Sequence, residues 1–129
     1  MTPLRWLPRL LDLGTVGLSL GLLALAAHAT LVPAEAAATY GIPAEGPGLA
    51  WVRAAGLRDG VLGLVVAATL RHRPVRPLVL AAALLLPLAD VVLSLDHAGP
   101  MATLPHATGF VGIAVLLALS LACDRGGDR

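Results

Sequence analysis

The sequence predicts an all-α integral membrane protein, an up-down bundle of four transmembrane helices. Three observations support this fold class. Hydrophobic residues make up 57% of the 129 residues and charged residues only 13%, about half of the ~25% that soluble domains carry. Four stretches reach or approach the ~20 apolar residues that a spanning helix needs. The arginines lie at alternate ends of these stretches, as the positive-inside rule requires.

The whole chain, 1–129, is expected to form one four-helix domain. The predicted spans cover residues 10–31, 49–70, 78–96 and 106–123. Residues 36–40 of the first connection are expected to form a plain loop rather than a short interfacial helix. Pro87 lies inside the third span and is expected to kink it. Most other prolines fall in predicted connections or first turns, where a missing N–H is tolerated; they include Pro33, Pro74, Pro77, Pro100 and Pro105.

Both ends of the chain are expected to lie in the cytoplasm, at a cell membrane that the chain crosses several times. The first and third connections contain no Arg or Lys, whereas the N-terminal segment, the second connection and the C-terminal tail all contain Arg. These basic residues are Arg5, Arg9, Arg71, Arg73, Arg76, Arg125 and Arg129. Because basic segments stay on the cytoplasmic side, this alternation predicts the orientation of every span.

The first span has an alternative interpretation as a cleaved signal peptide, because Ala27-His28-Ala29 resembles an A-x-A cleavage site. Its apolar run of about 18 residues is longer than the 7–15 residues of a typical signal core. The run also has a face of small residues that includes Gly17 and Gly21. We therefore expect the span to be retained.

Glycines at spacings of three and four mark the expected helix contacts, because small residues let membrane helices approach closely. Gly17 and Gly21 form a G-x-x-x-G pair in the first span, and Gly56, Gly60 and Gly63 share a face of the second. We expect these faces to pack within the bundle. A homodimer face formed by Gly17 and Gly21 is the alternative.

Charge and cysteine content exclude several classes of function. The net charge is +1 and no Lys is present, so no nucleic-acid partner is expected. The single cysteine, Cys123, excludes an internal disulfide and a cysteine-based metal site within one chain. The expected partners are membrane lipids and a lipophilic small molecule.

Ionisable side chains gather in the outer half of the predicted bundle. Asp59 lies ~13 Å and Asp90 ~9 Å from the outer end of its span, at ~1.5 Å per residue. His28 lies near the outer end of the first span, and His106 opens the fourth. All four spans therefore bring an ionisable group to the same region.

These groups are expected to pair, to protonate or to line a wet cavity, because a charge at helix centre costs about 2.5–3.5 kcal/mol on insertion scales. Arg53 and Arg58 are the expected partners of the carboxylates. A helical wheel places Arg58 away from the glycine face, so we expect it to reach a different neighbour or to snorkel outward. In the inner half, Asp12 is expected to pair with Arg9, three residues earlier.

The working hypothesis is an enzyme of isomerase, cyclase or oxidoreductase type, whose cavity takes a lipophilic substrate such as an isoprenoid or quinone. An arginine in that cavity would clamp an anionic group. The predicted catalytic residues, acting as acid or base, are Asp59, Asp90 and His106. The predicted binding residues are Arg53, Arg58 and His28.

Three other interpretations of the same residues remain. One is a metal site formed by His28, His106, Asp59 and Asp90, since imidazole and carboxylate suit zinc or iron; no ligand pair is spaced i, i+3 or i+4 within one helix, so no metal ligand is assigned, and the cofactor is left open. Another is proton-coupled binding or transport. The last is a buried ion-pair network that only fixes helix register.

Residues 52–63 resemble the signature of a family of small four-span membrane proteins of bacteria and fungi, described as domain of unknown function four-two-six-seven. In that family a G-x-R-D-x-x-x-G run opens the second span, an Asp follows in a proline-containing third span, and a His opens the fourth. This sequence matches those positions with Gly56, Arg58, Asp59, Gly63, Pro87, Asp90 and His106. The resemblance covers nearly the whole chain and implies a retained first span. The layout is also similar to DoxX-like and anthrone-oxygenase-like membrane proteins, which implies an enzyme acting on a hydrophobic metabolite.

Overall fold

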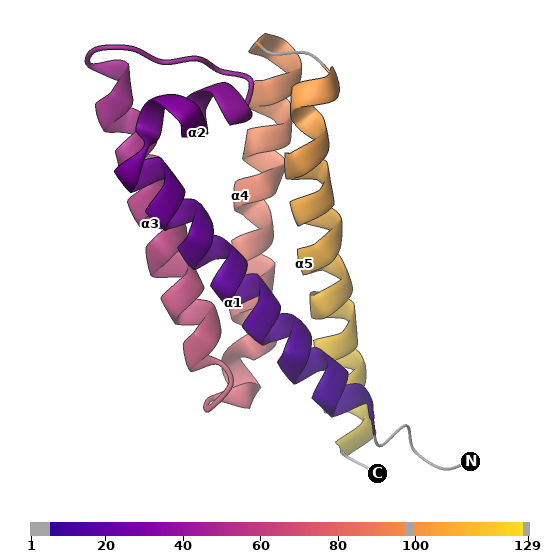
Figure 1. The fold of residues 1–129 in the computed structure, drawn as a ribbon. Helices are drawn as coiled ribbons and strands as arrows, with labels where there is room; N and C mark the ends of the chain where they lie inside the picture. Colours follow the sequence, from indigo (N-terminus) through magenta and orange to yellow (C-terminus); the bar gives the residue numbers. More distant parts are fainter. Residues whose placement is uncertain (1–5, 98–99, 128–129) are drawn as a thin grey trace.

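The all-α prediction is confirmed. The computed structural model describes residues 6–97 and 100–127, and every regular element in these residues is helical (Figure 1). The elements in chain order are α1 (Leu7–Leu31), α2 (Pro33–Thr39), α3 (Gly48–Ala68), the 3-10 turn η1 (Arg73–Val75), α4 (Arg76–His97) and α5 (Pro100–Gly127).

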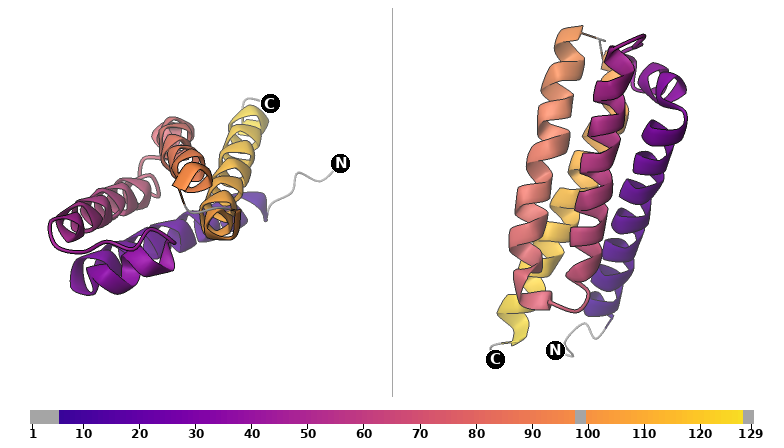
Figure 2. Two further views of the ribbon diagram at one scale, coloured as in Figure 1. Left: turned by 90° about the horizontal axis from the view of Figure 1, so that it is seen from above. Right: turned by 90° about the vertical axis from the view of Figure 1, so that its left-hand side faces the viewer.

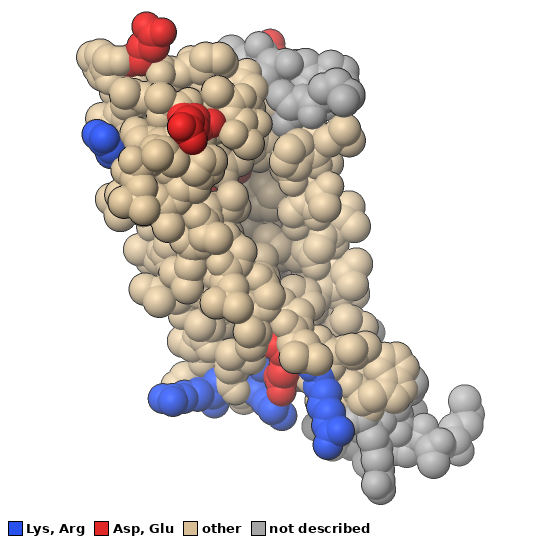
Figure 3. Space-filling model, in the orientation of Figure 1, with Lys and Arg blue, Asp and Glu red and all other residues tan. Residues whose placement is uncertain are grey.

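Four long helices, α1, α3, α4 and α5, run alongside one another in alternating directions (Figures 1 and 2). They form two tight pairs, α1 with α3 and α4 with α5, and the contacts between α3 and α4 are few. α1 begins and α5 ends at one end of the bundle, while α2 lies at the other (Figure 1). We call these the terminal end and the α2 end. Most of the Arg side chains visible in Figure 3 gather at the terminal end.

Among the described residues, three segments are long and apolar enough to cross a membrane, which marks a membrane protein. They are Leu7–Leu31, Arg73–Asp96 and Thr103–Asp124. α3 has 21 residues, which at ~1.5 Å per residue also matches the ~30 Å hydrocarbon core. It differs from the three apolar segments in its charged residues, Arg53, Arg58 and Asp59, so its composition alone does not identify it as a membrane span.

Small side chains let α1 and α3 approach closely. A Cβ atom added at Gly56 would lie 2.6 Å from the Cβ atom of Ala29, and one added at Gly63 would lie 3.1 Å from the Ser19 carbonyl oxygen. The Ser19 hydroxyl donates a hydrogen bond of 2.8 Å to the Gly63 carbonyl across this contact. Gly60 is similarly confined. The glycine face predicted for the second span is therefore the α1–α3 contact.

The packing role expected for the G-x-x-x-G pair of α1 is wrong within this chain. A Cβ atom added at Gly17 or Gly21 would meet no atom of the described residues within 4 Å, and both glycines are exposed. α1 contacts α3 through a different face, which includes Ser19 and Ala29. Gly17 and Gly21 instead border a cavity, which is described below.

Two connections differ from the sequence expectation. Residues 33–39 form the helix α2 rather than a loop: Pro33 takes the first helical position, where its fixed φ favours a helix, and Ala36 and Ala37 are buried. Pro105 lies inside α5 rather than in a connection. Near the beginning of a helix, a proline removes a single backbone hydrogen bond. Pro87 lies inside α4, as predicted.

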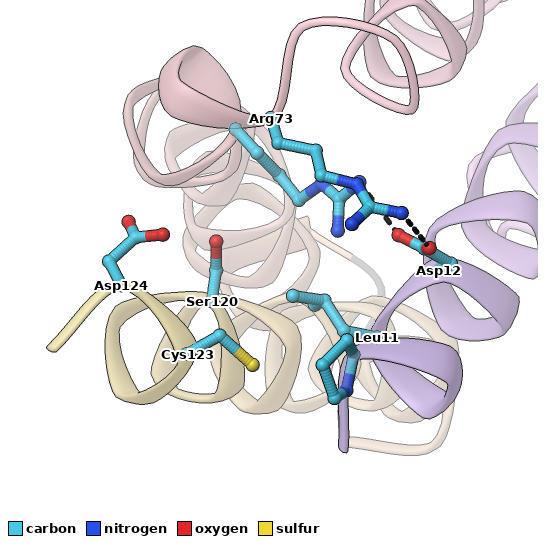
Figure 4. Close-up of a pocket in the computed structure, with 8 residues that line it drawn as sticks. Leu11, Asp12, Arg73, Ser120, Cys123 and Asp124 are labelled. Carbon is cyan, nitrogen blue, oxygen red and sulfur yellow. Dashed lines mark hydrogen bonds and ion pairs between the residues drawn. The ribbon is translucent and has the colours of Figure 1, made fainter. Parts of the chain in front are cut away.

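Near the terminal end, one carboxylate joins α1 to the beginning of α4. Asp12 accepts a 2.7 Å hydrogen bond from Nη2 of Arg73 and a 2.9 Å hydrogen bond from Nη2 of Arg76 (Figure 4). Arg76 is buried and also donates to the Thr69 carbonyl, at 3.2 Å. The predicted pairing of Asp12 with Arg9 is therefore wrong, because arginines from a facing element reach the carboxylate instead.

We expect Gly56→Ala to lower the stability of the protein, whereas Gly17→Ala leaves it unchanged or raises it. The new methyl group at position 56 would overlap Ala29, and overpacking of this kind costs about 1–3 kcal/mol. The methyl group at position 17 would enter open space and improve helix propensity. Thermal unfolding in mild detergent measures both variants; equal losses of stability would contradict the assigned α1–α3 contact.

Candidate functional site

A cavity of about 830 Å³ lies between the two helix pairs, in the half of the bundle nearest the α2 end. Most of its lining is apolar, and side chains of all four long helices contribute. Leu18, Leu62, Ala83 and Ile113 line the cavity and also belong to, or pack on, the hydrophobic core cluster of the bundle. The core therefore closes the end of the cavity that faces the middle of the bundle.

The cavity opens sideways, on the face of the bundle that meets lipid if the helices span a membrane. α1 and α5 contact each other near the terminal end, where a Cβ atom on Gly14 would overlap Leu116, and they diverge toward the α2 end (Figure 1). The space-filling view is hollowed between these two helices (Figure 3). Gly17 and Gly21 line the α1 side of the cavity and keep it open, because they have no side chains.

Arg58 and Asp59 of α3 form the central ion pair of the site. Nε and Nη2 of Arg58 donate hydrogen bonds of 3.0 and 2.9 Å to Oδ1 of Asp59. Both residues line the cavity. The face of α3 that carries the glycines packs on α1, so Arg58 points toward α4, where Nη2 lies 3.7 Å from Oδ2 of Asp90. Of the two alternatives for Arg58, contact with a neighbour away from the glycine face and snorkelling outward, the structure shows the first.

Asp90 of α4 and His106 of α5 face each other without a hydrogen bond. Nδ1 of His106 lies 3.8 Å from Oδ2 of Asp90, beyond the ~3.2 Å limit for a good N–H···O contact. His106 is largely buried and Asp90 is 30% exposed at its side chain. An acid–base pair at this separation leaves room for a proton-bearing group of a ligand to approach both side chains.

Tyr40, which directly follows α2, covers His106. The two rings stack with centroids 5.5 Å apart and planes inclined by 30°. Burial raises the pKa of the Tyr40 phenol above its ordinary value, the carboxylates of Asp59 and Asp90 raise it further, and Arg58 opposes them. At neutral pH the phenol therefore stays protonated and can donate a hydrogen bond into the site.

The structure brings together four of the six predicted site residues: Arg58, Asp59, Asp90 and His106 all line the cavity. Arg53 and His28 do not. Arg53 is exposed, and neither residue makes an ion pair with another described residue. In the part of the chain that the structure describes, no three His, Cys, Asp or Glu side chains are placed to hold a metal ion.

Arg58 lies beside the carboxylates that it is expected to pair with. Two of its nitrogens bond to Asp59 and one of them also faces Asp90, which leaves the alternative role of an arginine that clamps an anionic group without a free guanidinium among the described residues of this cavity. An anionic ligand would have to displace a carboxylate of the protein. Arg58 therefore acts on the carboxylates of the site rather than on an anion from outside.

Sequence reasoning missed three residues that shape the site: Tyr40, Gly17 and Gly21. Tyr40 is the only tyrosine of the chain, and this is the one signal in the sequence that distinguishes it. The two glycines were recognised as a G-x-x-x-G pair. Spacing alone does not tell a glycine that contacts a helix from one that leaves a space.

We expect the phenol of Tyr40 to ionise with a midpoint above the ordinary tyrosine value of about 10, and Asp90→Asn to lower that midpoint. The variant removes a negative charge that disfavours the phenolate. The ultraviolet absorbance of tyrosinate, followed in an alkaline titration, reports this residue alone because the chain has a single Tyr. Asp96→Asn, an exposed substitution on α4, is the control and should leave the midpoint in place; an equal shift in both variants would contradict the arrangement.

Comparison with known proteins agrees with the resemblance noted in the motif. No curated protein and no solved structure matches the chain. The model of one family matches residues 14–121, a segment that includes Arg58, Asp59, Asp90 and His106. The chain belongs to this family, described as Domain of unknown function (DUF4267).

Proposed function

We propose that this protein binds a lipophilic small molecule in the cavity between its helix pairs and performs acid–base chemistry on it. The observation that carries the proposal is the meeting of two features in one space. A largely apolar cavity of about 830 Å³ falls within the ~300–1,000 Å³ typical of small-molecule sites. One end of it holds the convergent polar side chains that such sites use for orientation and proton transfer.

In this proposal Asp90 and His106 form the acid–base pair. Each lies within 4 Å of the other, and catalytic contacts that are long without ligand shorten when substrate binds. Arg58 acts as a charge partner, holding Asp59 in place and attracting Asp90. Tyr40 provides a hydroxyl donor and shields His106 at the α2 end of the cavity.

The substrate enters from the bilayer in this proposal. The cavity is open along Gly17 and Gly21, and a membrane-dissolved molecule reaches such a lateral opening without crossing water. The surrounding apolar surface then holds the hydrocarbon part of the molecule, while the polar side chains meet its head group.

We further propose that α3 is the fourth span and that both ends of the chain are cytoplasmic. α3 runs between the same two ends of the bundle as α1, α4 and α5, the helices of the three apolar segments (Figure 2). The charges of Arg58 and Asp59 offset each other. Four arginines lie at the terminal end, which the positive-inside rule assigns to the cytoplasm: Arg9 in the first turn of α1, Arg71 and Arg73 between α3 and α4, and Arg76 at the beginning of α4. Arg5 and Arg129 lie outside the described residues, as does the side chain of Arg125.

A purified sample in mild detergent is expected to retain a lipophilic molecule at one copy per chain. Native mass spectrometry at a resolution that identifies small adducts measures it. Gly21→Leu would place a side chain in the cavity and should remove the adduct. Gly112→Leu is the matched control, because Gly112 of α5, like Gly21 of α1, has open space around it but does not line the cavity; loss of the adduct in both variants, or in neither, would argue against the site.

Asp90→Asn should abolish conversion of the bound molecule while changing the free energy of unfolding by less than about 1 kcal/mol, because exposed or loosely paired charges stabilise little. Conversion is followed by chromatography and mass spectrometry of the small molecule released from the protein after incubation with membrane lipid extract, since an isomerisation changes the retention time but not the mass. A non-catalytic ion-pair network is the competing function, and the bonding of Arg58 to Asp59 favours it. That network predicts that Asp59→Asn and Asp90→Asn both destabilise the protein and that the double variant loses no more. Ion-dependent uptake into vesicles without a new product would indicate a transporter.

A further inference from the structure

The charged groups at the polar end of the cavity do not balance. Arg58 is the one cation among the described residues that line the cavity, and it faces two carboxylates, Asp59 and Asp90. With His106 neutral, the site carries a net charge of −1. In an apolar cavity such an excess is not screened by water, so the site attracts a cation and repels an anion.

The hydrogen bonds at this end are unequally distributed. Asp59 accepts two hydrogen bonds from Arg58 through one oxygen atom. Asp90 accepts none from any described residue, since the two nitrogen atoms that approach its carboxylate, Arg58 Nη2 and His106 Nδ1, lie 3.7 and 3.8 Å away. A partly buried carboxylate without a donor is destabilised unless water or a ligand supplies one.

A donor placed beside Asp90 would also reach His106. The Oδ2 atom of Asp90 is the atom that both long contacts share, so a small donor head group at this oxygen sits next to the imidazole as well. The Tyr40 ring covers the imidazole from the α2 side. The direction left open is the apolar cavity, from which a hydrocarbon-bearing molecule would present its head.

We infer that the ligand of this cavity is a lipophilic amine, whose ammonium group donates to Asp90 and whose hydrocarbon part lies along Gly17 and Gly21. The inference rests on the proposed function, because it names the head group of the same ligand. The site lacks a positive charge and hydrogen-bond donors, and an ammonium group supplies both. A neutral alcohol supplies only the donor. A carboxylate or phosphate supplies neither and would compete with Asp59 for Arg58.

Three probes with the same saturated chain test the head group: decylamine, decanol and decanoic acid. Each is titrated into the full-length protein in nanodiscs of a zwitterionic lipid, with empty nanodiscs as the reference for partitioning, and occupancy is read by native mass spectrometry. We expect decylamine to bind at least about tenfold more tightly than decanoic acid, because juxtaposed like charges disfavour the acid. Decanol should fall between them.

Asp90→Asn is expected to reduce the preference for the amine over the alcohol by about tenfold. Asp96→Asn, an exposed substitution on the same helix, should leave that preference unchanged. Equal or tighter binding of decanoic acid to the wild-type protein would overturn the inference, as would an unchanged preference in Asp90→Asn.

Gly21→Leu separates failure of this inference from failure of the proposed function. If Gly21→Leu weakens all three probes while the acid binds best, the cavity is a binding site and only the head group is wrong. If Gly21→Leu and Gly112→Leu leave the binding of every probe unchanged, the cavity is not a binding site and both proposals are wrong.

Discussion

The arrangement of this protein depends on the charges of α3. Arg58 and Asp59 lie in the middle part of α3, whose other residues are almost entirely apolar. A charge in such surroundings must be paired with another charge or remain hydrated. Their mutual hydrogen bonds meet part of that requirement. Arg58 also attracts a second carboxylate, that of Asp90 of α4, and Asp90 in turn faces His106 of α5. One charged pair thus orders the facing side chains of three helices.

The second determinant is the uneven use of glycine. On α3, Gly56 and Gly63 remove side chains where α1 approaches, so these helices form a close pair. On α1, Gly17 and Gly21 remove side chains where no helix approaches, so a space remains. The same residue type therefore produces contact in one place and a cavity in another. Because the two helix pairs touch mainly through the central core, the cavity keeps its volume without loosening either pair.

At the terminal end, the carboxylate of Asp12 has a contrasting role. It is bound by two arginines at once, and Arg76 is buried beside it with a further bond to Thr69. This cluster holds α1 against the beginning of α4, at the end where α1 also meets α5 (Figure 4). A carboxylate that accepts hydrogen bonds through both of its oxygen atoms, as Asp12 does, is typical of a structural cluster, in contrast to the α2 end, where Asp90 accepts no hydrogen bond from the described residues. This difference between the carboxylates of Asp12 and Asp90 in the hydrogen bonds that they accept is the reason for placing function at the α2 end.

The sequence by itself determined the helical membrane class, the approximate limits of the four long helices, the family, and the set of Arg58, Asp59, Asp90 and His106. These follow from local quantities, because apolar length and charge are read along the chain and a motif is a matter of spacing. Depth along each helix was enough to bring the four side chains to the same half of the bundle. It was not enough to exclude Arg53 and His28, which lie at similar depth but on other faces.

Only the tertiary structure decided which surfaces meet. It paired α1 with α3 through Ser19 rather than through Gly17 and Gly21, gave Asp12 the partners Arg73 and Arg76, and placed Tyr40 over His106. The physical reason is that the four long helices present similar aliphatic surfaces, so hydrophobicity does not distinguish one neighbour from another. Contacts between helices distant in sequence depend on where small residues allow a close approach and on which charges face inward, and these are properties of the assembled bundle.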